Sequence, residues 1–209
     1  MLFRSANIEG DALSRADLEM GAAFVGQRGG GLLVLGAKSF DRQGLLGTAL
    51  EEVLPLTLSA RGDGVVRASS RGGSYAVAVT PEGQSHPVMR IGANADENAR
   101  RWHAVPPLAG AATLGAPRPG AQVLALVKAP DGSRPLVAVQ RYGQGRSMMF
   151  TGEASWRWRM QMPSEDRTFE LFWRQAVRWL AASSPDAVSV APVSGVAPGD
   201  AAEIGRAHV

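Results

Sequence analysis

The sequence predicts an α/β fold in which a mostly parallel sheet has helices on both faces, and three observations lead to it. A capped helix over 14–28 is followed by three glycines and a wholly apolar strand over 32–35. Three further strands follow closely between 122 and 151, and an amphipathic helix runs from 167 to 182. A helix that turns sharply into a strand buried on both faces is half of a βαβ unit.

The first helix is predicted from its start and stop signals. Ser14 with Asp17 three residues later fits a capping box, and apolar residues between 18 and 25 recur at helical spacing. Gly29-Gly30-Gly31 ends the helix, because glycine accepts the left-handed backbone of a C-terminal cap. The strand that precedes this helix is expected at or before the N-terminus.

The middle of the chain carries weaker signals. Residues 40–58 read as a loop leading to a short helix near 50–53. Two strands are expected over 65–68 and 75–80, and the stretch 82–119, rich in Pro, Gly and Asn, is expected to be irregular.

The last third is predicted with more detail. Strands over 122–127, 136–141 and 146–151 are separated by the turns Asp131-Gly132 and Gly143-Gln144-Gly145. The helix that follows has an unbroken apolar stripe typical of a core-facing surface rather than a ligand site, formed by Phe169, Phe172, Trp173, Ala176, Val177 and Leu180.

Composition changes near Pro185, which sets the predicted domain boundary. We expect an α/β domain over 6–183 and, over 184–202, a linker with the truncated start of a β-rich domain. Residues 1–5 and 203–209 resemble translated sequencing-adapter ends, so we interpret the chain as a metagenomic fragment whose two ends are artefacts.

Charge and composition exclude several classes of protein. The net charge of +3 comes almost wholly from dispersed arginines, and the densest group, Arg141, Arg146, Arg157 and Arg159, indicates a solvated surface rather than a nucleic-acid track. The chain has no cysteine, which excludes disulfides, cysteine-ligated zinc and a cysteine nucleophile. No apolar run of about 18 residues is present, so we expect no direct membrane insertion by this segment.

No cofactor or metal is predicted. The glycines at 29–31 follow a helix instead of opening one, so they do not form a phosphate loop. His86 and His103, with carboxylates such as Asp96 and Glu97, match no metal-ligand spacing.

Two weak site candidates remain from the residues alone. Ser39 lies in the turn after the apolar strand, with His86 as a possible base and Asp41 or Glu153 to orient it, but GAKSF lacks the flanking glycines of a nucleophile elbow. Trp156 and Trp158 alternate and form either a stacking platform for a sugar or a base, or a hydrophobic lid over the sheet edge.

Five segments together resemble the glutamine amidotransferase-like domain of large bacterial membrane proteins, which often also carry a von Willebrand factor A domain. The segments, in chain order, are GGGLLVLGAKSF, HPVMRI, a Trp followed after three residues by PPL, YGQGRSMMFTGEASWRWRM and FELFWRQAVRWL. The resemblance covers about 6–183. It implies the flavodoxin-like three-layer sandwich of class I glutamine amidotransferases.

The same resemblance implies where the active-site cysteine would be, in the elbow after the strand GLLVLG. That position falls at about Ala37 or Lys38, neither of which supplies a nucleophile. The late His-x-Glu pair of the family is also missing, because the only histidine after His103 is His208, which lies in the suspected artefact end.

We therefore expect a catalytically inactive domain that binds a ligand or a partner. The resemblance implies a membrane-anchored envelope protein with this domain in the periplasm or otherwise outside the cytoplasm. Its partners would be other domains of the same protein or envelope proteins, and not nucleic acid. The alternatives are a hydrolase or amidotransferase using Ser39 with His86, and a carbohydrate-binding module using Trp156 and Trp158.

Overall fold

A computed structural model describes residues 2–6, 13–35, 45–58, 65–67, 75–129 and 132–183. The strands are β1 (Leu2–Ala6), β2 (Gly31–Leu35), β3 (Val65–Arg67), β4 (Ala76–Val79), β5 (Gly110–Ala112), β6 (Gln122–Ala129), β7 (Gly132–Tyr142) and β8 (Gly145–Phe150). The helices are α1 (Arg15–Arg28), η3 (Glu51–Val53), α2 (Pro81–Ser85), η4 (Pro87–Met89), α3 (Ala95–Ala104), α4 (Trp156–Gln161) and α5 (Thr168–Ala181), with η marking 3₁₀ turns.

Six strands form one mixed sheet in the order β1-β2-β8-β7-β6-β4. The neighbours β1, β2 and β8 run parallel, whereas the pairs β8–β7, β7–β6 and β6–β4 are antiparallel. The expected mostly parallel sheet is thus corrected to a mixed one. The reason is local, because only two residues separate β7 from β8 and β6 from β7, and connections this short can join only antiparallel neighbours.

The parallel half begins with the predicted βαβ unit, in which α1 connects β1 to its neighbour β2. The capping box is present: the Ser14 hydroxyl accepts from the Asp17 N–H at 3.2 Å, and the Asp17 carboxylate accepts from the Ser14 N–H at 3.1 Å. Gly29 ends the helix with φ of 69°, as the glycine run predicted.

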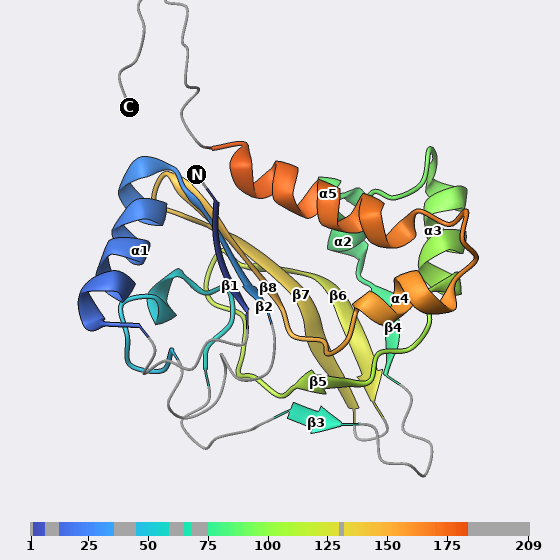
Figure 1. The fold of residues 1–209 in the computed structure, drawn as a ribbon, viewed down its shortest axis with the longest axis horizontal. Coiled ribbons are helices and arrows are strands. Elements are labelled where there is room, and N and C mark those ends of the chain that lie inside the picture. Colours follow the sequence, from blue (N-terminus) through green and yellow to red (C-terminus); the bar gives the residue numbers. More distant parts are fainter. Residues whose placement is uncertain are drawn as a thin grey trace, which may run out of the picture.

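Helices cover both faces of the sheet, with α1 on one side and α3, α4 and α5 on the other (Figure 1). The strand β2 contributes to both cores, because Leu33 packs in the α5-side cluster while Leu32 and Val34 pack in the α1-side cluster. Its apolar run is therefore explained by burial on two faces.

Helix α5 presents the predicted apolar stripe to the sheet. Phe172, Ala176 and Leu180 are buried, whereas Val177 is 39% exposed and lies at the margin of the stripe. The Phe172 ring meets Trp102 of α3 edge-on, with ring centroids 5.5 Å apart. The aromatic residues of the predicted stripe, Phe169, Phe172 and Trp173, thus pack in or against the core and do not form a ligand site.

The segment 82–119 is not irregular as expected, since it holds α2, η4, α3 and β5. The two helices start at side-chain caps: the Thr80 hydroxyl accepts from the Gly83 N–H at 3.0 Å, and the Asn94 amide oxygen accepts from the Glu97 N–H at 2.9 Å. Both helices are short, and α3 buries only Asn98 and Trp102. Such helices have no broad apolar stripe for a sequence pattern to reveal.

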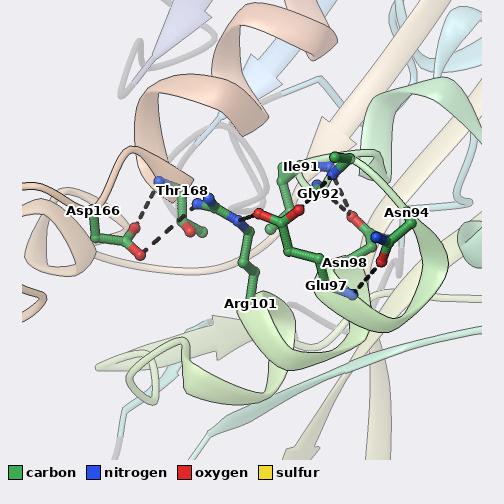
Figure 2. A network of polar contacts seen from close by, with 9 residues as sticks. Ile91, Gly92, Asn94, Glu97, Asn98, Arg101, Asp166 and Thr168 are labelled. Atoms are coloured by element: carbon green, nitrogen blue, oxygen red, sulfur yellow. Dashed lines mark hydrogen bonds and ion pairs between the residues drawn. The ribbon is translucent and has the colours of Figure 1, made fainter.

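A polar network on helix α3 binds two neighbouring segments, the loop that precedes α3 and the start of α5 (Figure 2). The Asn98 side-chain oxygen accepts from the N–H groups of Ile91 and Gly92, at 2.7 and 3.1 Å. Arg101, on the same helix, lies 4.0 Å from the carboxylate of Asp166, just before α5. The network fixes the segment that leads from η4 into α3.

Candidate functional site

In open α/β sheets, ligands and nucleophiles lie beyond the carboxyl ends of the parallel strands. Here β2 ends at Leu35, so the elbow would follow this carboxyl end. Ala37, Lys38, Ser39 and the possible orienting residue Asp41 all lie outside the described residues. The elbow without a nucleophile and the role of Ser39 therefore stay predictions.

At the same carboxyl ends, the structure describes the chain that follows β8. The N–H of Ala112 in β5 donates to the Thr151 carbonyl at 2.9 Å, and the N–H of Glu153 donates to the Gly110 carbonyl at 2.8 Å. Ala154, with φ of 57°, then turns the chain into α4. The strand β5 thus crosses the end of β8 and holds Glu153 at the carboxyl ends of the parallel strands.

A pocket of about 480 Å³ lies at the opposite ends of these strands. Its lining includes His86, Gln122, Arg141, Arg146 and Trp179. Arg146 pairs with Gly31, the first residue of β2, so this pocket lies at the amino ends of the parallel strands. His86 is therefore placed at the end of β2 opposite to the one from which the elbow segment leaves.

Two arginines face each other in this pocket. Arg141 of β7 and Arg146 of β8 are direct cross-strand partners. Side chains alternate along a strand, so Arg146 lies on the same face as Met148, which packs in the α5-side core. Within the described part of the chain, neither arginine forms an ion pair and no carboxylate lines the pocket.

Arg146 is held against the end of α5. One terminal nitrogen donates to the Trp179 carbonyl at 2.8 Å, and the guanidinium carbon lies 5.0 Å from the centroid of the Trp179 ring. A cation at a helix C-terminus complements the helix dipole. Burial, and next the charge of Arg141, lower the pKa of Arg146. Its Nε atom is buried and finds no hydrogen-bond partner among the described residues.

His86 is uncharged at neutral pH. Its Nδ1 accepts the N–H of Val88 at 3.2 Å and caps η4, while its ring meets Trp179 edge-on with centroids 5.3 Å apart. Burial, and then the nearby charge of Arg146, lower its pKa from 6.5 to about 4. Because Nδ1 is an acceptor in the neutral ring, Nε2 carries the proton and acts as a donor. That tautomer does not suit the general-base role proposed with Ser39.

The motif HPVMRI is clamped between α3 and α5. The indole Nε1 of Trp102 donates to the Met89 carbonyl at 2.8 Å, and the Gln175 amide donates to the Arg90 carbonyl at 3.3 Å. The following PPL motif is fixed similarly, because Trp158 Nε1 donates to the Pro106 carbonyl at 2.9 Å. These motifs therefore form one structural unit, which positions His86 at the pocket.

The two tryptophans of α4 do not form a shared platform. Trp156 is 61% exposed, whereas Trp158 is buried at 1% in the aromatic core beside Phe150 and Phe172. A sugar-stacking surface made by both rings is therefore corrected, because Trp158 closes the core at the end of the sheet. This counts against the carbohydrate-binding alternative.

His103 lies apart from His86. It is exposed on α3 and lines a second cavity of about 490 Å³ with Asp96, Trp102 and Lys128, beside β4. Among the described residues, no three histidine, aspartate or glutamate side chains are grouped as a metal site would require. None of the described helices is long and apolar enough to cross a membrane.

Sequence reasoning missed Arg141, Arg146 and Trp179 as site residues, although one signal was present. The two-residue turn Gly143-Gln144 between β7 and β8 sets Tyr142 opposite Gly145 and hence Arg141 opposite Arg146. The spacing RYGQGR therefore contains the arginine pair. Nothing in the sequence alone brings Trp179 to it.

The family model described as "Putative glutamine amidotransferase" (GATase1-like) matches residues 5–182. A search of curated proteins gave no match. Among solved structures, the cytoplasmic protein STM1381 from Salmonella typhimurium LT2 is similar with a TM-score of 0.60 and 22% identity, covering 86% of this chain and 71% of that chain. The cytoplasmic protein STM3548 from Salmonella typhimurium is similar with a TM-score of 0.61 and 21% identity, at the same coverage of 86% and 71%. At this identity the likeness concerns the fold.

Proposed function

This chain belongs to the glutamine amidotransferase-like family, and we propose that it is a ligand- or partner-binding module that does not hydrolyse glutamine. The observation that carries the proposal is the complete absence of cysteine from the sequence. Glutamine hydrolysis in the class I fold proceeds by attack of a cysteine thiolate, and neither alanine nor a protonated lysine at the corresponding position performs that attack.

The described histidines support the same proposal. His86 is neutral, accepts a backbone N–H on Nδ1 and lies at the amino ends of the parallel strands. His103 is exposed on α3. A nucleophile in the elbow needs a base within hydrogen-bond reach, and His86 lies at the opposite ends of the parallel strands.

The test is to assay the purified protein for glutaminase, amidase and esterase activity beside its Ser39→Ala and His86→Asn variants. We expect no turnover above the buffer rate in any of the three proteins. Turnover that is lost in both variants would overturn the proposal and restore the Ser39–His86 hydrolase. A cysteine-dependent glutaminase, assayed in parallel, shows that the conditions detect the reaction.

We further propose that the domain is extracytoplasmic and anchored through membrane helices elsewhere in a longer envelope protein, with other domains of that protein as partners. The support is the ordered set of motifs, which resembles the domain found in such proteins. The two similar solved structures are named cytoplasmic proteins, and a cytoplasmic location is therefore the outcome that would overturn this proposal. Sequencing the full gene and fractionating cells that express it decide between the two locations.

A further inference from the structure

We propose that the pocket formed by Arg141, Arg146, His86 and Trp179 binds a small, doubly charged oxyanion ligand, either a dicarboxylate or a phosphate. The inference deepens the proposed function, on which it rests, by giving the binding module a site and a class of ligand. It assigns the ligand to the amino ends of the parallel strands, away from the elbow.

The first support is the unpaired charge. Arg141 and Arg146 are direct cross-strand partners on one face of the sheet, and like charges in such positions destabilise a sheet. Among the described residues, no carboxylate lines the pocket to offset them. A bound anion would turn this repulsion into two charge-assisted contacts, and the guanidinium fork matches the oxygens of carboxylate and phosphate.

The second support is how Arg146 is held. It keeps its charge in a partly desolvated place, stacked on Trp179 and anchored to the end of α5. Its buried Nε has no acceptor among the described residues, so the hydrogen-bonding capacity of this guanidinium is not filled by the protein groups that the structure describes. A guanidinium fixed by one arm and by its face is preorganised to bind with the rest.

The third support is the chemistry of the remaining lining. His86 is neutral, so its Nε2–H is a donor for the ligand. Its acceptor atom, Nδ1, is occupied by the backbone N–H of Val88 and is not presented to the ligand. Gln122, whose strand position pairs with Val139, adds an amide to the same wall. A volume of about 480 Å³ suits a small molecule, and the surfaces of Val139 and Trp179 would contact its carbon skeleton.

The experiment is isothermal titration calorimetry at low salt, with succinate and inorganic phosphate as probes and the uncharged succinamide as a control ligand. We expect one site for at least one of the two anions and none for succinamide. Arg141→Gln, which leaves the contacts of Arg146 with α5 intact, should weaken binding about tenfold or more, since a charge-assisted contact is lost. The matched variant Arg100→Gln, which removes an exposed arginine of α3, should change binding less than about twofold.

The outcomes separate the ligand sources and the two proposals. Binding of succinate alone identifies a dicarboxylate site, and binding of phosphate alone identifies a phosphate site. No binding of either anion, equal effects of the two arginine substitutions, or equal binding of succinamide would overturn the inference and leave the proposed lack of glutaminase activity intact. Conversely, glutamine turnover would remove the proposed function without removing the anion site.

Discussion

Arg141 of β7 lies directly opposite Arg146 of β8, and no acidic side chain among the described residues offsets the pair. In the free protein this pair is a source of repulsion. We expect Arg141→Gln to raise the free energy of unfolding by about 0.2–1 kcal/mol at low ionic strength. Urea denaturation measures the change, and the gain should shrink when salt screens the charges.

The control for this prediction is Arg100→Gln, which removes the same charge from α3. It should leave the free energy of unfolding nearly unchanged. If both substitutions stabilise the protein equally, the effect belongs to the net charge of +3 and not to the pair.

A second prediction concerns pH. The pKa of His86 is about 4 in the fold, against an ordinary value of 6.5, so between these values the unfolded chain binds a proton that the folded chain does not. The stabilisation from neutral His86 is complete above about pH 6.5 and is lost as the pH falls toward about 4. For a half-buried ring beside Arg146 and Arg141, we expect a loss of about 1 kcal/mol across this window.

The variant that tests this is His86→Asn, which can keep the cap on η4 but does not titrate. Denaturation at several pH values should show a flatter dependence in this variant than in the wild type. His103→Asn, at an exposed position, should retain the wild-type slope. A slope unchanged by His86→Asn would show that other groups cause it.

A third prediction tests the clamp on the HPVMRI segment. Trp102→Phe removes the donor to the Met89 carbonyl and part of the ring contact with Phe172, so we expect a loss of about 2–3 kcal/mol in unfolding free energy. Trp156→Phe makes the same chemical change at a ring that is 61% exposed, and should alter stability by less than about 0.5 kcal/mol. Similar effects at the two positions would contradict the clamp.

The loop before α3 supplies a fourth prediction. Asn98→Ala leaves the N–H groups of Ile91 and Gly92 without their acceptor, and burial makes this costly, about 2–3 kcal/mol. Asn94→Ala removes only an exposed helix cap and should cost about 1 kcal/mol. Thermal unfolding of the two variants ranks them, and a larger loss for Asn94→Ala would refute the role given to Asn98.

Local signals predicted the elements that depend on them. The capping box at Ser14 and the left-handed Gly29 set the limits of α1. The strand β2 could be predicted from its apolar run because it is buried on both faces of the sheet. The helices α2 and α3 were missed because side-chain caps and tertiary contacts stabilise them, and α3 buries only Asn98 and Trp102. Pairing direction was misjudged although the short turns between β6, β7 and β8 already required antiparallel strands.

Only part of the candidate pocket could be predicted from the sequence. The turn at Gly143-Gln144 could have placed Arg141 opposite Arg146. It could not have brought the end of α5 and the segment of His86 to the same place, because these contacts depend on how helices pack on the sheet. Tertiary packing therefore assembles a site from residues that no local pattern joins.

We propose that this chain combines the glutamine amidotransferase-like fold with the lack of a catalytic nucleophile. Incubation with a diazo-ketone analogue of glutamine, followed by intact-mass and peptide mass spectrometry, tests it most directly, because the reagent marks an active-site nucleophile even when turnover is slow. We predict an unchanged mass under conditions that fully label a cysteine-dependent glutaminase. A single adduct on a peptide containing Ser39 would contradict the claim.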